Sequence, residues 1–282
     1  MNPSTLIGVI TSAVLLATVV LFTAHAPDSF LNLPGLAIVI TGTLAASFIS
    51  YPLDELRRLL HQVRVVFHRE TPRRELDADL DQLIEMARHW NRGNIRAVES
   101  VLANTTSPFL RTGMQMVIAN SREEEIREML RWRMMRLKTR ERADAQILRT
   151  MAVYAPAFGM LGTLVGLINM LEVIQAGDIA IIGPRLAIAL MSTFYGILLA
   201  NLAFKPVAVK LERRTEARLI AMTLLLEGVT MVSKRRLPAF IEEALGTYRA
   251  EYRDEMRDTP APTSSAAPSP AATAAPETSR TA

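Results

Sequence analysis

Two stretches decide the fold: residues 151–174, MAVYAPAFGMLGTLVGLINMLEVI, and residues 181–204, IIGPRLAIALMSTFYGILLANLAF. Each is long enough to cross the hydrocarbon core of a membrane as a helix, which takes roughly 20 residues. Their centres carry hydroxyl groups, small residues and prolines, but no carboxylate. Because ion paths through membranes usually include a buried ionisable group, these spans predict half of an ion site. The acid that completes the site would come from a partner.

Two further apolar stretches, Thr5–Ala24 and Leu33–Tyr51, precede these spans. Hydrophobic residues make up 50% of the chain and charged residues 21%, and the charges are concentrated between the apolar stretches. The pattern predicts an all-α integral membrane protein with four transmembrane helices and a large helical cytoplasmic insertion between helices 2 and 3. A cleavable signal peptide is the weaker interpretation of Thr5–Ala24, because Met1–Thr5 lacks a basic region.

The distribution of basic residues predicts the orientation. The connections His25–Asn32 and Gln175–Gly183 contain no Lys or Arg. Arginines and lysines instead flank the other ends of the spans: Arg57, Arg58, Arg64, Arg140, Arg142, Arg149, Lys205, Lys210, Arg213 and Arg214. Loops rich in Lys and Arg remain on the cytoplasmic side of a membrane, so both termini are predicted to be cytoplasmic. These flanks also account for the basic pI, and no nucleic-acid partner is expected.

Composition divides the chain into five parts: residues 1–51 (transmembrane helices 1 and 2), 52–149 (cytoplasmic helical loop), 150–210 (transmembrane helices 3 and 4), 211–257 (cytoplasmic C-terminal helix, continuous to about Arg253) and 258–282 (tail). The tail consists mainly of Pro, Ala, Ser and Thr, a composition typical of disorder. Helical spacing in the loop predicts two packing faces. These are Leu76, Leu80, Leu83, Ile84 and Ala87, and Ile126, Leu130, Met134 and Leu137.

The opposite faces of the loop helices are crowded with charge, including Arg92 and Glu99. One interpretation is a solvated surface with ion pairs along each helix. The other is an electrostatic contact surface for a cytoplasmic partner. The sequence leaves both interpretations open.

Small and hydroxyl-bearing residues line spans 3 and 4. Small residues let membrane helices approach closely, and we expect this role of Gly159, Gly162, Gly166 and Gly196. The hydroxyls of Thr163, Ser192 and Thr193 either bond to their own helix backbone or face an ion path. Both interpretations are kept.

Two prolines interrupt the backbone hydrogen bonding of these spans. Pro156 cannot donate to the carbonyl of Ala152, and Pro206 likewise leaves that of Leu202 free. Pro206 lies where a span could simply end. Pro156 lies deeper, where an unmet carbonyl is costly unless it faces water, an ion path or a mobile helix. We therefore predict that Pro156 has a functional role.

Specific stretches of this sequence resemble the MotA/PomA family, the membrane stator subunit of the bacterial flagellar motor. They are APAFGMLGTLVGL at 155–167, IGP at 182–184 and ALMSTFYGILLAN at 189–201. The resemblance covers about residues 1–250. It implies a ring of such chains, expected to be a pentamer, in the bacterial inner membrane. The ring would surround two MotB-like chains, each contributing a helix with the missing aspartate, and ion flow would turn it against the rotor protein FliG.

The resemblance also implies roles for individual residues. Pro156 and Pro206 match the family's functional prolines, and Thr193 matches a hydroxyl position that faces the ion path. Glu99 matches a loop acid of the rotor contact. The basic loop position departs from the family pattern, because the alignment places Asn91 there and Arg92 one residue later.

The resemblance implies no cofactor other than the transported ion, which is a proton or sodium. A dehydrated sodium ion needs several oxygen ligands, which Thr163 and Thr193 could supply, whereas a proton needs a titrating carboxylate and a water chain. No metal site is expected, because His25, His61, His68 and His89 are not spaced as ligands. An enzyme is therefore not expected. The alternatives are an ExbB/TolQ-type subunit of a proton-driven complex, which usually has three spans, and a structural scaffold, which leaves Pro156 unexplained.

Overall fold

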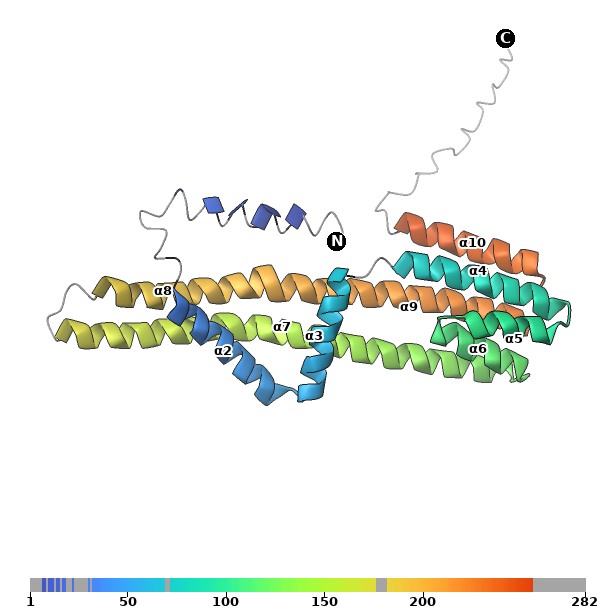
Figure 1. Cartoon of the computed structure of the whole chain (residues 1–282), viewed down its shortest axis with the longest axis horizontal. Helices are drawn as coiled ribbons and strands as arrows, with labels where there is room; N and C mark the ends of the chain where they lie inside the picture. Colours follow the sequence, from blue (N-terminus) through green and yellow to red (C-terminus); the bar gives the residue numbers. More distant parts are fainter. Residues whose placement is uncertain are drawn as a thin grey trace, which may run out of the picture.

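The computed structural model describes residues 32–68, 72–175 and 182–255, together with Phe30 and scattered positions between 7 and 22. Its described residues form helices joined by short turns, with no strand among them, which confirms the all-α class (Figure 1). The helices are α2 (Leu33–Ser50), α3 (Leu53–His68), α4 (Pro72–Asn91), α5 (Ile95–Asn104), α6 (Pro108–Ile118), α7 (Glu123–Gln175), α8 (Ile182–Leu198), the π-helix η3 (Leu199–Phe204), α9 (Lys205–Ser233) and α10 (Pro238–Glu255).

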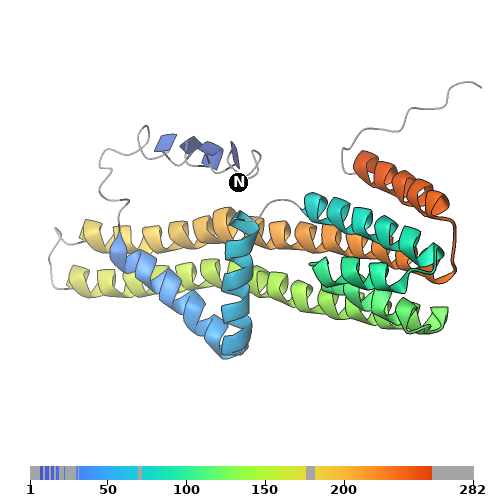
Figure 2. The ribbon, with the colours of Figure 1, turned by 45° about the vertical axis from the view of Figure 1, so that its right-hand side comes forward.

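Two long helical rods form the frame of the molecule. One is α7, a single helix of 53 residues, and the other is the succession α8, η3 and α9. The two rods lie side by side along their length in both views (Figures 1 and 2). At 1.5 Å per residue α7 is about 80 Å long, far more than a membrane requires. The predicted boundary between residues 149 and 150 therefore falls inside one continuous helix.

Three helical segments of the described chain are long and apolar enough to cross a membrane. They are Leu33–Ser50 and apolar windows within Glu123–Glu172 and Arg185–Ser233. The stretch Thr5–Ala24, predicted as the first span, lies outside the described residues apart from scattered positions.

Helix α2 is fixed at its start by polar contacts with α8. The Asn32 side chain accepts a hydrogen bond from the Gly35 N–H at 3.0 Å, which caps the helix. The Tyr195 hydroxyl accepts from the Asn32 N–H at 2.9 Å and donates to the Phe30 carbonyl. The α2 helix thus begins beside α8 and then crosses to α7.

Helix α3 runs across the two rods and is anchored by an ion pair (Figure 2). The Arg58 guanidinium lies 2.8 Å from the carboxylate of Asp144, which is buried in α7. Hydrogen bonding to Asp144 raises the pKa of Arg58 above its ordinary value. Breaking such a pair would leave a buried carboxylate without compensation, so the pair fixes where α3 lies.

The helices α4, α5, α6 and α10 gather on the far ends of α7 and α9 around one hydrophobic core. The predicted packing faces are confirmed at Leu76, Leu80, Leu83 and Ala87 and at Ile126 and Leu130, all of which are buried in this core. Met134 packs against this core while half-buried, and Ile84 and Leu137 are also half-buried.

The continuous helix predicted to reach about Arg253 is wrong. The α9 helix ends at Ser233, and α10 begins at Pro238. Pro238 lacks the N–H that a continuing helix would need, and Arg235 adopts a left-handed backbone conformation with φ 52°. The chain therefore reverses, and α10 packs against α4 and α9.

Glycines set the distance between α7 and α8. A Cβ added to Gly166 would lie 2.6 Å from Ala189 Cβ, and one added to Gly159 would lie 2.9 Å from the Ser192 carbonyl oxygen. From the other rod, a Cβ on Gly196 would lie 2.6 Å from the Ala155 carbonyl oxygen. Backbone therefore lies against backbone at both ends of this contact.

We predict that Gly196→Ala weakens this contact, since the Ala155 carbonyl belongs to a helix backbone and cannot rotate away. Overpacking of this kind costs about 1–3 kcal/mol. A lower thermal denaturation midpoint of the detergent-purified protein would report the loss. Gly183→Ala is the matched control, because nothing lies within 4 Å of a Cβ at Gly183. Equal midpoints for the two variants would contradict the prediction.

Candidate functional site

Three hydroxyl groups meet where α7 and α8 are closest. The hydroxyls of Thr163 and Thr193 share a hydrogen bond across the two helices. The Ser192 hydroxyl donates to the Ala189 carbonyl at 2.7 Å and also lies 3.0 Å from the Gly159 carbonyl oxygen. Thr163 and Thr193 each lie 3.1 Å from that same Gly159 oxygen. The sequence-predicted hydroxyls are thus gathered in one cluster.

This hydroxyl cluster, Thr163, Ser192 and Thr193, concentrates oxygen atoms without a charge. Two backbone carbonyls, those of Gly159 and Ala189, complete a group of neutral oxygens. Ser192 is fully buried, whereas Thr163 and Thr193 are half-buried. The hydroxyls satisfy one another and the backbone, as helix packing requires. The same oxygens could also receive a cation or a water chain, provided that a neighbouring helix supplies a carboxylate.

Pro156 lies about two helical turns from Thr163 along α7. It is half-buried, and its Cα would lie 3.1 Å from a Cβ on Gly196. The Ala152 carbonyl, which it leaves without its usual helical donor, belongs to a residue buried with Val39, Ala155 and Ala200. Pro156 therefore lies at a close contact between the rods, about 10 Å along α7 from Thr163 of the hydroxyl cluster.

The π-helix η3, which hydrophobic spacing does not reveal, lies opposite this part of α7. Ala200 packs on Ala152 and Ala155, and the Lys205 N–H donates to the Ala200 carbonyl, a hydrogen bond spanning five residues. Pro206, which is exposed, follows at once and cannot donate to Leu202. A change to wider hydrogen bonding just before a proline is a physical response to that missing donor, and π-helices often occur at functional sites. Of these features, only Pro206 can be recognised in the sequence.

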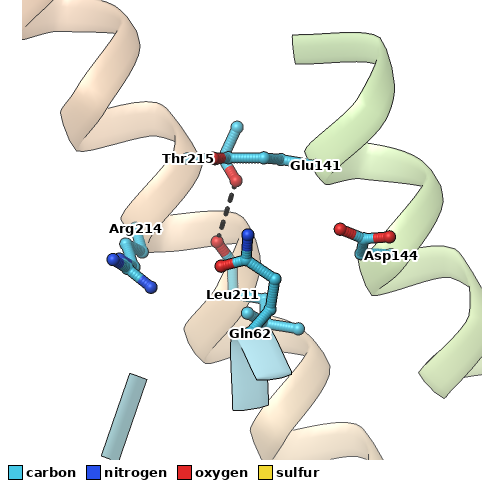
Figure 3. A pocket seen from close by; sticks show the side chains of 6 residues that line it. All are labelled: Gln62, Glu141, Asp144, Leu211, Arg214 and Thr215. Carbon is cyan, nitrogen blue, oxygen red and sulfur yellow. Dashed lines mark hydrogen bonds between the residues drawn. The ribbon is translucent and has the colours of Figure 1, made fainter. Parts of the chain in front are cut away.

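A second polar site lies where α3, α7 and α9 meet (Figure 3). Glu141 and Asp144 of α7 line a small cavity together with Thr215 of α9, and Thr215 donates a hydrogen bond to the Leu211 carbonyl at 3.0 Å. The cavity between them holds about 10 Å³, room for roughly one water molecule. Glu141 pairs with Arg218 of α9 and Asp144 with Arg58 of α3, so this site is a compensated ionic joint that ties α7 to both helices.

The sequence carries a signal for this joint in the spacing of two carboxylates. Glu141 and Asp144 are three residues apart and share the face of α7 that carries Ala145 and Leu148. Carboxylates on the apolar face of a helix predict buried partners.

Arg92 and Glu99 lie far from the hydroxyl cluster, at the α4–α5 end of the molecule (Figure 1). Arg92 occupies the turn after α4, beside Gly93 with φ 71°, and Glu99 lies within α5. Both are exposed, and neither forms an ion pair with any residue the structure describes. Their side chains are available to a partner.

The described part of the chain contains no group of three or more His, Asp or Glu residues arranged to hold a metal ion. His25 lies outside the described residues, and His61 is exposed on α3. The charged and hydroxyl groups described above are therefore the candidate functional groups of this structure.

Comparison with known proteins agrees with this arrangement. The model of the MotA/TolQ/ExbB proton channel family matches residues 102–224. The chain is 32% identical to the uncharacterized protein YtxD of Bacillus subtilis (strain 168) over 82% of this chain and 83% of that one. It is 28% identical to motility protein A of Borreliella burgdorferi, covering 80% and 86% of the two chains.

A solved structure of the flagellar MotAB stator complex from Bacillus subtilis contains a similar fold. It superposes with a TM-score of 0.76 at 26% identity and covers 90% of this chain and 98% of that one. The agreement extends over both rods and the helices at their ends, because so little of either chain is left out. The chain therefore belongs to the MotA/TolQ/ExbB proton channel family, with MotA-type stator subunits among its relatives.

Proposed function

We propose that this chain is the MotA-like subunit of a flagellar stator, an ion channel whose ion flow drives rotation. The observation that carries the proposal is the hydroxyl cluster between two membrane-spanning helices that contain no acid of their own. Similarity to motility protein A and to a MotAB complex over most of the chain supports it. A subunit of this kind is not an enzyme, as the sequence predicts.

Similarity to the family supports the following assembly as part of the proposal. A MotB-like partner supplies a transmembrane helix with the missing carboxylate, next to Thr163 and Thr193. Copies of this chain surround that partner as a homo-oligomeric ring, expected to be a pentamer, in the bacterial inner membrane. Each copy crosses the membrane four times, with Thr5–Ala24 as the first span and both termini in the cytoplasm. Residues 52–149 are proposed to lie in the cytoplasm together with the residues after the fourth span, where α9 and α10 form two helices, and the tail 258–282 completes the cytoplasmic part.

Pro156 is proposed to couple ion binding to movement of the rods. We expect Pro156→Ala to restore a donor to the Ala152 carbonyl, straighten α7 and reduce torque, while assembly with the partner is kept. Torque of tethered cells and co-purification of the partner would be measured together. Ala157→Ser is a control on the exposed neighbouring position. Normal torque in the Pro156→Ala strain would refute this role.

Arg92 and Glu99 are proposed to contact the rotor protein FliG, because they are exposed and have no partner among the described residues. Charge reversal at either position should reduce swimming speed, and an opposite reversal on FliG should partly restore it. Reversal of Glu85, exposed on α4, serves as the matched surface control. If strains that carry Arg92→Glu or Glu99→Arg swim at the wild-type speed, the two residues belong to a solvated surface and do not contact FliG.

The ion is proposed to be a proton or sodium, and one experiment separates the two. Swimming speed would be measured in a strain with this stator and its MotB-like partner as the only pair, at varied sodium and fixed pH, with and without a protonophore. Speed that follows sodium assigns Thr163 and Thr193 as oxygen ligands. Speed that ignores sodium and falls with the protonophore assigns a proton path and leaves Thr163 to helix packing. Swimming that responds to neither treatment contradicts the stator function.

A further inference from the structure

An apolar groove with a basic rim opens between α3 and the cytoplasmic part of α7. It encloses about 510 Å³, and its lining includes Glu55, Trp132, Met135, Arg136, Thr139 and Arg140. Trp132 is 56% exposed and Met135 is 65% exposed. Side chains of this size and kind are enriched at protein interfaces. Arg136 lies over the Trp132 ring, 5.5 Å from its centroid, and the α3–α7 groove is otherwise left open by the residues that the structure describes, as a protein-binding surface would be.

A matching strip lies on the outside of α9. Arg213, Glu216 and Thr223 are exposed along one line of the helix, and Ile220 between them is 37% exposed. None of the charged members forms an ion pair with another described residue. This outer strip of α9 is narrow and convex, whereas the α3–α7 groove is concave.

Ion pairs between the rods fix the relative heights of the two surfaces. Ion pairs join Arg149 to Glu212, Glu141 to Arg218 and Arg127 to Glu227, so α7 and α9 run antiparallel. Counting from the Glu141–Arg218 pair, Ile220 is level with Thr139 to within about one turn. The groove and the strip therefore lie at the same depth relative to the membrane spans.

The two surfaces also point in opposite directions. Glu141 and Arg218 mark the sides of α7 and α9 that face each other. At about 100° per residue, Trp132, Met135 and Thr139 lie about 120–180° around α7 from Glu141. Glu216, Ile220 and Thr223 lie about 140–160° around α9 from Arg218. One copy thus presents the groove on one flank and the strip on the other.

Charge favours a second copy as the occupant. Arg136 and Arg140 have no ion-pair partner within the described chain, and neither does Glu216 of the strip. With Ile220 placed against Thr139, Glu216 comes level with Ala143, within one turn of Arg140, and Arg213 comes toward Glu55. Pairing the groove with itself would instead bring the arginines of two copies together, which opposes association.

The membrane restricts how copies can be related. All copies share one orientation, so their symmetry axis is parallel to the membrane normal and corresponding residues stay at one height. A contact between two different surfaces around such an axis is heterologous, and a heterologous contact that closes forms a ring. Equal height and opposite flanks are the conditions that such a contact requires.

We propose that the outer strip of α9 of one copy docks into the α3–α7 groove of the next copy, with Ile220 beside Thr139 and Glu216 within one turn of Arg140. This inference rests on the proposed ring and names the surfaces that close it in the cytoplasm. In this register Met135 lies beside the Thr223 end of the strip and Trp132 about one turn beyond it, and the charged residues set the register.

Cysteine cross-linking tests the contact directly, because the chain has no cysteine of its own. Thr139→Cys/Ile220→Cys would be produced in the full chain with its MotB-like partner, and isolated membranes would be oxidised. A disulfide needs Cβ atoms about 3.5–4.5 Å apart. We expect a ladder of covalent oligomers on a non-reducing gel that ends at the closed ring. The reduced sample should show the single chain only.

Matched controls separate this contact from others. Val209 lies on the same face of α9 and is exposed, but it is about 16 Å nearer the membrane than Ile220. Thr139→Cys/Val209→Cys and each single variant should therefore stay uncross-linked. Dimers of Thr139→Cys alone would show a two-fold contact and overturn the inference.

The native size of the wild-type complex separates the two possible failures. A native complex of many copies in which the 139–220 disulfide does not form would overturn this contact and leave the proposed ring intact. A single copy would overturn the proposed ring as well. Glu216→Arg should shorten the ladder of the Thr139→Cys/Ile220→Cys chain, and adding Arg140→Glu should lengthen it again. A ladder unchanged by Glu216→Arg would contradict the pairing of these charges.

Discussion

The close contact between the two rods is the constraint on which the structure depends. Lipid is as apolar as a leucine side chain, so the hydrophobic effect gives membrane helices little reason to associate, and close packing has to hold them together. Gly159, Gly166 and Gly196 supply that packing by bringing backbone atoms into contact. The hydroxyl cluster lies inside the same contact. Stability and the candidate ion path therefore depend on the same few residues, so a substitution at any of them affects both.

Outside the membrane the rods are held by other means. The ionic joint around Glu141 and Asp144 fixes α3 and pairs the rods, and the core around Leu83 and Leu130 fixes the helices at their ends. Charged groups can be satisfied there because water is near, whereas an equally buried pair within the lipid would carry a larger desolvation cost. The change from small residues to ion pairs along α7 follows the change in its surroundings.

Much of this was predictable from the sequence, for identifiable reasons. Apolar length predicted the spans at Leu33–Ser50 and within both rods, and helical spacing predicted that Leu83 and Leu130 are buried. Both signals are local. The continuity of α7 was not predicted, because a charged segment and an apolar segment look like separate elements even when no residue ends the helix between them. The π-helix was not predicted because wider hydrogen bonding leaves no mark on hydrophobic spacing. The ionic joint was not predicted because a carboxylate is expected to be exposed as long as its partner is unknown.

The length of α7 has a mechanical consequence. About 33 residues separate Pro156 from Glu123, so the helix extends about 50 Å beyond the proline as a lever. A tilt of about 5° at the proline would carry the far end through about 4 Å, on the order of one side chain. A rearrangement too small to open a gap between the rods would thus become a sideways stroke at the end of the molecule that carries Arg92 and Glu99.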